Sequence, residues 1–198
     1  MLRVRRIVNS FFSSNTYLLS ATDSNDCWLV DIGDVSEVEK YLQPKSVIKG
    51  LFLTHSHYDH IYGINELCTK HPQCIVYTSE FGKVALKDNK KNLSLYNEHP
   101  MIYTGGVCVL RDGDSLNIFG NIPIRVLATP GHCASCLSYV IGDNIFTGDS
   151  YIPNIPTVTN LPNGDKKEAK KSIEKIMSLS VGRVICPGHG PRVQSKNM

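Results

Sequence analysis

Four short segments of the chain gather side chains that commonly bind metal ions. The first is HSHYDH at residues 55–60, which follows an apolar, strand-like stretch. Imidazole and carboxylate groups crowded into one strand-to-helix turn are costly to desolvate without a cation. His55 and His57 are two residues apart in extended backbone and point to the same side, whereas Asp59 and His60 lie beyond the turn and can aim at a neighbouring point. The segment predicts a metal site with room for two adjacent ions.

The other three segments each place one candidate ligand beside a glycine, after a strand-like stretch. Glycine permits the sharp backbone turn that presents such a side chain. A single histidine or Gly-Asp pair of this kind is ordinarily a surface residue or a turn, so the specificity comes from the repetition. The three candidates are His132 in TPGH at residues 129–132, Asp149 in FTGD at 146–149 and His189 in CPGHG at 186–190.

The segments between these motifs alternate between strand and helix patterns, which predicts a layered α/β fold. A capping box formed by Ser36 and Glu39 predicts a short helix that ends before Pro44. Apolar residues at helical spacing after the histidine cluster predict a second helix that includes Ile61. The strands expected in this half of the chain are Tyr17–Leu19, Cys27–Ile32, Val47–Leu53 and Cys74–Tyr77.

The second half of the chain favours antiparallel strands and one longer helix. Residues 107–127 are rich in β-branched side chains and broken by turn signals, which predicts antiparallel strands. A further hairpin is expected within 139–147. Asp165 followed by Glu168 predicts the start of a helix whose lysines face solvent.

Length and composition limit the class of protein. The 198 residues fit one compact domain, which we expect to span residues 1–198. The net charge of +3 is spread along the chain, so a nucleic-acid partner is not indicated. We find no secretory signal and no apolar run of the roughly 18 residues that cross a bilayer. The odd number of cysteines, 7, favours free thiols in a reducing compartment, and hence a cytoplasmic protein without membrane partners.

The order His-x-His-x-Asp-His, followed by His, Asp and His on separate loops, resembles the metallo-β-lactamase superfamily. The resemblance covers nearly the whole chain and includes LVDIG at residues 29–33, which is similar to the first motif of the family. It implies a four-layer αβ/βα sandwich with the metals at one edge between its two sheets. It also implies that one ion is bound by His55, His57 and His132, that the other is bound by Asp59, His60 and His189, and that Asp149 bridges them.

Departures from the family patterns narrow the choice among its branches. Two-zinc β-lactamases carry a cysteine where Asp149 stands, and the flavo-diiron reductases carry a glutamate in place of His57 and a flavin domain. The nuclease branches bring an RNA-binding arm or an inserted domain. The pattern is most similar to the group of hydroxyacylglutathione hydrolase, small lactonases and persulfide dioxygenases. Only nine residues follow His189, so the glutathione contacts of a C-terminal helical domain are not carried over.

We therefore expect a hydrolase that attacks an ester, thioester or lactone of a small-molecule substrate with hydroxide bound to two divalent ions. Asp59 would bind metal and orient the nucleophile, beside the bridging Asp149. Zinc is the default expectation, and iron or manganese suit the same ligands. One alternative is a persulfide dioxygenase with a single iron. The other is a binding module without activity, against which the complete ligand set argues.

Four further features of the sequence bear on the site. The loops 87–106 and 150–162 are expected to frame a substrate pocket. Within the second loop, Tyr151 is the candidate substrate contact, or else an aromatic that packs under the loop. Cys133 and Cys136 form a C-x-x-C motif that is either a redox pair or buried packing. Asp31 is implied to lie behind the metal ligands, and its simpler role is to cap a turn.

Overall fold

Two six-stranded sheets follow one another along the chain in this computed structural model, which describes residues 1–195. The first sheet keeps its strands in chain order. β1 and β2 and then β2 and β3 pair antiparallel, whereas β3 to β6 run parallel to one another. The strands are β1 (Leu2–Val8), β2 (Asn15–Ala21), β3 (Asp26–Val30), β4 (Val47–Phe52), β5 (Ile75–Thr78) and β6 (Val107–Val109).

The second sheet has the order β12-β11-β10-β9-β8-β7. Its neighbours pair antiparallel except β10 and β11, which are parallel because α4 connects them as a crossover. The strands are β7 (Ser115–Ile118), β8 (Ile122–Ala128), β9 (Leu137–Ile141), β10 (Asn144–Gly148), β11 (Val184–Pro187) and β12 (Val193–Gln194).

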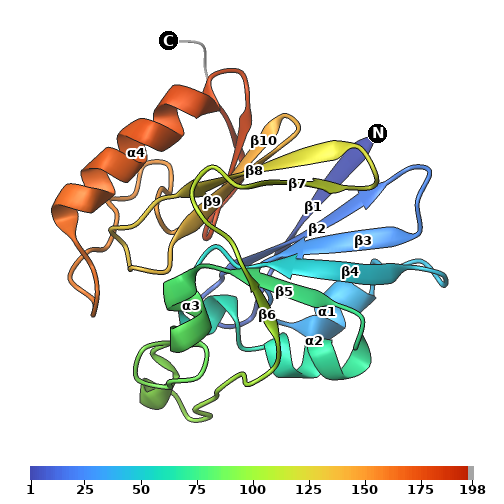
Figure 1. Ribbon diagram of the computed structural model, residues 1–198, viewed down its shortest axis with the longest axis horizontal. Helices are drawn as coiled ribbons and strands as arrows, with labels where there is room; N and C mark the ends of the chain where they lie inside the picture. The colour runs from blue at the N-terminus through green and yellow to red at the C-terminus, as the bar shows by residue number, and fades with distance from the viewer. Residues whose placement is uncertain (196–198) are drawn as a thin grey trace.

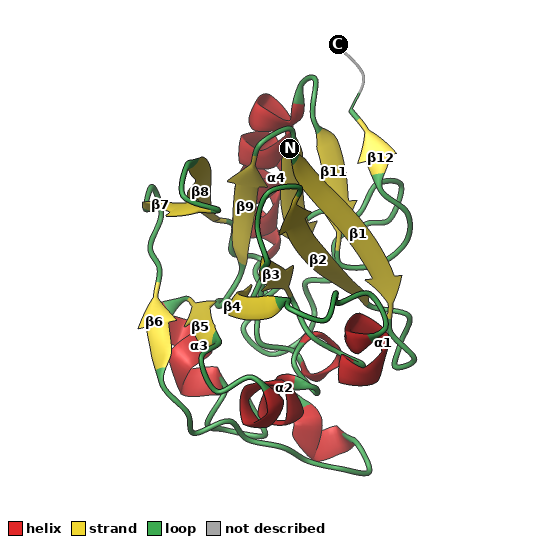
Figure 2. Cartoon of the chain, turned by 90° about the vertical axis from the view of Figure 1, so that its right-hand side faces the viewer, coloured by secondary structure: helices red, strands yellow, loops and turns green. Residues whose placement is uncertain are grey.

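Helices cover the outer face of each sheet. Figure 1 shows α1, α2 and α3 beneath the first sheet and α4 above the second, and Figure 2 shows the same separation from the side. The four-layer αβ/βα arrangement is therefore the one that the sequence predicts. The helices are α1 (Val35–Glu39), α2 (Ile64–Lys70), α3 (Glu80–Ala85) and α4 (Lys166–Ser180), with short 3-10 helices η1 (Tyr58–His60) and η2 (Ser94–Tyr96).

Adjacent residues of the central strands fill different cores, since successive side chains of a strand point to opposite faces. In β3, Leu29 packs toward α1 and α2, whereas Val30 packs between the sheets. In β10, Phe146 joins the core between the sheets and Ile145 packs against Ile176 of α4. Both faces of these strands are buried, which explains their continuous apolar sequences.

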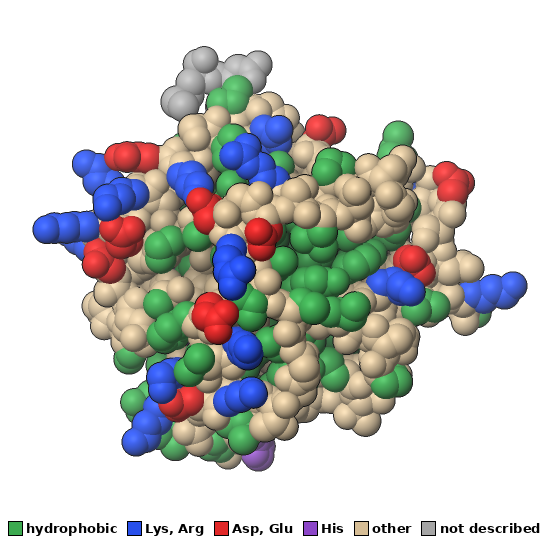
Figure 3. Space-filling model, in the orientation of Figure 1, with side chains coloured by type: hydrophobic (Ala, Val, Ile, Leu, Met, Phe, Trp, Pro, Cys, Tyr) green, Lys and Arg blue, Asp and Glu red, His purple; other side chains and the backbone are tan. Residues whose placement is uncertain are grey.

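Helix α4 begins as the sequence predicts. The side chain of Asp165 accepts hydrogen bonds from the backbone N–H groups of Lys167 and Glu168, at 2.8 and 3.0 Å. Ala169 and Ile176 are buried, while the lysines near its start are exposed and gather on the surface over α4 in Figure 3. None of the helices in residues 1–195 combines the length and hydrophobicity that a membrane crossing requires.

The structure corrects three expectations. Helix α1 begins at Val35, one residue before the Ser36 of the predicted capping box, so Asp34 occupies the N-cap position. Its side chain does not cap the helix, because the carboxylate accepts hydrogen bonds from Ser10 and Tyr62 instead. β6 joins the first sheet as a parallel strand, so only the rest of the 107–127 region is antiparallel. Helix α2 begins at Ile64, so Ile61 lies before it as the residue that caps the end of η1.

Candidate metal centre

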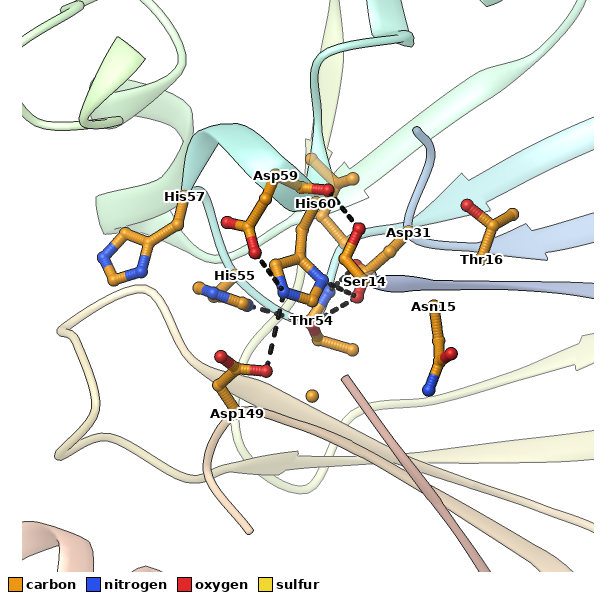
Figure 4. Close-up of polar contacts among 12 residues, drawn as sticks. Ser14, Asn15, Thr16, Asp31, Thr54, His55, His57, Asp59, His60 and Asp149 are labelled. Atoms are coloured by element: carbon orange, nitrogen blue, oxygen red, sulfur yellow. Dashed lines mark hydrogen bonds and ion pairs between the residues drawn. The ribbon is translucent and has the colours of Figure 1, made fainter. Parts of the chain in front are cut away.

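The candidate ligands all follow the C-terminal ends of strands that lie deep in the two sheets. The HSHYDH segment leaves β4 in the first sheet, whereas His132, Asp149 and His189 follow β8, β10 and β11 in the second. Figure 4 shows His55, Asp59, His60 and Asp149 turned toward one another. Because both sheets end here, residues more than a hundred positions apart share one site.

Three histidines form the first group of candidate ligands. The potential ligand atoms of His55, His57 and His132 all lie within 4.8 Å of one another. Nε2 of His132 is 2.9 Å from Nδ1 of His57. Burial lowers the pKa of both His55 and His132, so these imidazoles are neutral near pH 7, which is the form that binds metal.

Asp59, His60 and His189 form the second group, again with ligand atoms within 4.8 Å of one another. Oδ2 of Asp59 is 3.3 Å from Nε2 of His60 and 3.2 Å from Nε2 of His189. Burial would raise the pKa of the Asp59 carboxyl, but the two histidines hold it well below its usual range. The group therefore offers an ionised carboxylate beside two imidazoles.

Asp149 lies between these two groups. Its Oδ2 atom is 3.8 Å from Nε2 of His132 in the first group and 3.5 Å from Nε2 of His189 in the second. Its Oδ1 atom is 3.5 Å from Nε2 of His60. One carboxylate thus reaches toward both groups, as the bridging role implied by the resemblance requires.

Unpaired polar atoms show that this donor set fits metal ions. Among residues 1–195, Nε2 of His55 and Oδ1 of Asp149 are buried and have no hydrogen-bond partner. A buried polar atom without a partner costs about 1–3 kcal/mol. Imidazole nitrogens and carboxylate oxygens are the donors that divalent zinc, iron and manganese accept. A cation in each group would satisfy atoms that the protein itself leaves unpaired.

Backbone carbonyls orient two of the imidazoles. Nδ1 of His132 lies 2.9 Å from the oxygen of Val158, and Nδ1 of His189 lies 3.1 Å from the oxygen of Phe12. A carbonyl oxygen only accepts a hydrogen bond, so each Nδ1 carries the proton. Each Nε2 therefore faces the site as the nitrogen that can bind a metal ion. Both rings are fixed in the orientation that metal binding needs.

Asp31 lies behind the ligands, at the end of β3. Its carboxylate accepts hydrogen bonds from the Thr54 amide at 2.7 Å and the Thr54 hydroxyl at 2.6 Å, and lies 3.0 Å from Nδ1 of His60. The potential ligand atoms of Asp31, His55 and His60 also lie within 4.8 Å of one another. The contacts with Thr54 and His60, however, already occupy both oxygens of Asp31. Its backbone φ of +57° is unusual for a non-glycine residue, and such strain concentrates at functional sites.

Two glycines make room for the site. A Cβ atom on Gly188 would lie 2.0 Å from Oδ1 of Asp149, and one on Gly148 would lie 2.4 Å from Oγ1 of Thr54. Gly148 also has a φ of +50°. The glycines beside the predicted ligands therefore permit close approach of the loops, which is the role that the sequence assigns to them.

The loop between β1 and β2 contacts the site, although no motif in it indicates this. The Ser14 hydroxyl donates to the carbonyl oxygen of Asp59 at 2.6 Å, and the Asn15 amide donates to that of Gly188 at 2.7 Å. Phe12 orients His189 as described above. The segment NSFFSSNT at residues 9–16 shows neither helical nor strand periodicity, so the sequence gives no signal for these contacts.

Tyr151 lies away from the candidate ligands. Its ring packs against the cluster of Leu127, Ile145, Ile176 and Ile185 beneath α4. It is not among the residues that line the cavity beside the histidines. The geometry therefore matches the packing interpretation of Tyr151 and gives no support to a substrate contact.

Cys133 and Cys136 lie beside the first histidine group. Both are buried free thiols, with sulfur atoms 3.4 Å apart, and Sγ of Cys133 is also 3.1 Å from the Ser135 hydroxyl. Ser135 in turn contacts Ser56 through its hydroxyl at 2.9 Å. The motif thus packs the His132 loop against the HSHYDH segment.

A cavity of about 380 Å³ opens onto the candidate ligands. His57, Asp59, His132 and Asp149 all reach its surface. The loops 87–106 and 150–162 both contribute lining residues, so they frame the cavity as predicted.

Residues 9–189 match the family model of the metallo-beta-lactamase superfamily, and the chain therefore belongs to this superfamily. Such proteins hold metal at clusters of histidine and aspartate like the one described above.

Individual relatives differ in function and length. A hydroxyacylglutathione hydrolase of Salmonella typhi is 28% identical over 179 residues, which cover 90% of this chain but only 62% of that protein. The crystal structure of the BLEG-1 B3 metallo-beta-lactamase is 25% identical, with a TM-score of 0.88, covering 96% of this chain and 93% of that chain. The crystal structure of ETHE1 from Myxococcus xanthus is also 25% identical, with a TM-score of 0.72, and the match covers 96% of this chain and 76% of that chain.

Proposed function

We propose that the protein hydrolyses an ester, thioester or lactone of a small molecule with the help of two divalent metal ions. His55, His57 and His132 would hold one ion and Asp59, His60 and His189 the other, with Asp149 shared between them. The observation that carries this proposal is the convergence of both groups on Asp149, with buried donor atoms left unpaired on His55 and Asp149.

A pair of such ions supplies a nucleophile by lowering the pKa of water and polarises a carbonyl oxygen. The chain's own residues prepare this chemistry. Asp59 is ionised and reaches the cavity, so its carboxylate can accept a hydrogen bond from the attacking water and orient it. His132 and His189 present Nε2 because backbone carbonyls hold their Nδ1 protons.

Zinc is the metal that we propose, because sites of imidazole and carboxylate ligands in hydrolases suit it. Thioesters are included because the curated relatives are named hydroxyacylglutathione hydrolases. These relatives are longer than this chain, so the recognition of glutathione is not part of the proposal.

The test is a substrate panel presented to zinc-loaded protein: a phenyl ester, a thioester, a lactone, a phosphodiester and a β-lactam. We expect hydrolysis of at least one of the first three and a loss of about 100-fold or more in Asp149→Ala, as is typical when a transition-state contact is removed. Asp143→Ala, in the exposed turn between β9 and β10, is the matched control. Activity that survives both Asp149→Ala and chelation would reject the proposal.

A second candidate is oxidation of a persulfide by a single iron. It is favoured by the three-histidine group, which is a complete set for one ion by itself. Oxygen consumption with glutathione persulfide by iron-loaded protein, without hydrolysis of any ester, thioester or lactone by zinc-loaded protein, would replace the first proposal with this one.

A further inference from the structure

The cavity at the candidate metal centre has a polar floor and apolar walls. The floor is formed by side chains of the two candidate ligand groups. None of the residues that line it in the described part of the chain is a lysine or an arginine. The walls include Phe11, Phe12, Tyr58, Tyr96, Val158 and Leu161.

Several wall side chains expose apolar surface at the mouth of the cavity. Phe12 is 71% exposed and Tyr96 is 75% exposed, although both rings are large enough to favour burial. Val158 and Leu161 are also exposed, on the opposite loop. Apolar surface held in the open around a concave site indicates a ligand that covers it.

The aromatic wall packs together and is connected to the candidate ligands. The Phe11 ring packs against Phe12 with centroids 4.3 Å apart and edge-on against Tyr58 at 5.1 Å. Phe12 has a φ of +50°, a strained backbone conformation, and its carbonyl orients His189. The wall is therefore connected to the candidate metal centre through the contact between Phe12 and His189.

We propose that this wall binds the uncharged, apolar acyl group of the substrate, an inference that rests on the proposed hydrolase function. A carboxylate on these walls would lose hydration without finding a lysine or arginine to pair with, which is unfavourable. An aliphatic or aromatic acyl chain would instead cover Phe12, Tyr96 and Leu161. Glutathione carries two carboxylates and an ammonium group, so its thioesters fit this cavity poorly.

The kinetic test compares two 4-nitrophenyl esters of equal chain length, hexanoate and the monoester of adipate, with zinc-loaded protein. We expect kcat/KM to be about tenfold or more higher for hexanoate, a preference of roughly 1.4 kcal/mol. Leu161→Arg should reverse or abolish this preference by giving the adipate carboxylate a partner. Val181→Arg, at an exposed position that does not line the cavity, should leave the preference unchanged.

Tyr96→Ala separates binding from chemistry. Loss of the Tyr96 ring should raise KM for the hexanoate ester several-fold with kcat little changed, because Tyr96 lines the cavity and belongs to neither candidate ligand group. An adipate ester hydrolysed as efficiently as the hexanoate ester, or a preference that Leu161→Arg leaves intact, would overturn the inference.

A binding measurement distinguishes failure of this inference from failure of the hydrolase proposal. Hexanamide and adipamate are titrated separately into methyl-labelled, zinc-loaded protein while the methyl resonances of Leu93, Val158 and Leu161, which all line the cavity, are recorded. Saturable shifts with hexanamide only, together with no hydrolysis of the ester, thioester or lactone, would support the apolar site and reject the hydrolase. Equal or tighter binding of adipamate would reject the apolar site whether or not esters are cleaved.

Discussion

Oδ2 of Asp31 lies 3.0 Å from Nδ1 of His60, with both side chains buried. An ionised Asp31 can only accept, so this contact keeps the His60 proton on Nδ1 and leaves Nε2 free to face Asp59 and Asp149. The Thr54 amide and hydroxyl hold the carboxylate in place. Asp31 thus sets the tautomer of a candidate metal ligand, while its own oxygens are engaged by Thr54 and His60.

The first prediction is that Asp31→Asn weakens metal binding at the second group. The asparagine amide can keep the Thr54 amide contact but offers an N–H to Nδ1 of His60, which moves the imidazole proton to Nε2. Loss of such an outer partner costs about 10–100-fold in metal affinity. Zinc titration against a competing chelator measures this, with Asp143→Asn as the control. An unchanged affinity in Asp31→Asn would remove Asp31 from the account.

The second prediction concerns Gly188. In Gly188→Ala, the new methyl group would meet Oδ1 of Asp149 at 2.0 Å and displace that carboxylate. We expect metal content to fall from two ions per chain while far-ultraviolet circular dichroism stays native. Gly106→Ala, where a Cβ meets no atom within 4 Å, is the matched control. Full metal content in Gly188→Ala would mean that Asp149 does not bridge the two groups.

Sequence alone predicts the layered fold and the ligand loops because both depend on local patterns. Each candidate ligand follows a strand end and sits beside a glycine or in one dense cluster, and those neighbours determine how the loop turns. Asp165 likewise caps α4 as predicted, because a cap needs only the next three residues. Asp34 could not be interpreted in this way, since its partners Ser10 and Tyr62 come from other segments.

Features that depend on partners far away in the chain could not be predicted from the sequence. β6 pairs parallel with β5 because the chain returns to the first sheet after a long loop, and no local pattern specifies that choice. Phe11 and Phe12 line the cavity because a positive φ at Phe12 turns the loop, and phenylalanine gives no warning of such a backbone. Tyr151 follows Asp149 closely in the sequence, and its position there could not show that its ring packs against the apolar cluster beneath α4.

The third prediction is a pH dependence of the metal-free protein. Burial would lower the pKa of His189, but hydrogen bonds to Asp149 and Asp59 raise it to about 9. A pKa raised in the folded state stabilises the protonated form, so this contribution is complete below the unfolded value of about 6.5 and is lost as pH rises through about 9. The Tm of metal-free protein should therefore fall across this range, and less so in His189→Ala.

Zinc should act in the opposite direction over the same pH range. A metal ion must displace the His189 proton, so zinc affinity should rise between about pH 6.5 and 9. Differential scanning fluorimetry with and without zinc follows both effects in parallel. A Tm of the metal-free protein that is equally flat in wild type and His189→Ala would show that the Asp149 and Asp59 contacts do not bind a protonated imidazole.

The most direct measurement of the central claim is native mass spectrometry of the zinc-saturated chain. The account predicts two zinc ions per chain, loss of one in His132→Ala and loss of the other in His189→Ala. His99→Ala, an exposed histidine outside the site, should keep both. A wild-type chain that retains no zinc would contradict the two-ion centre on which the proposed chemistry depends. So would a wild-type chain that binds one ion and loses it only in His99→Ala.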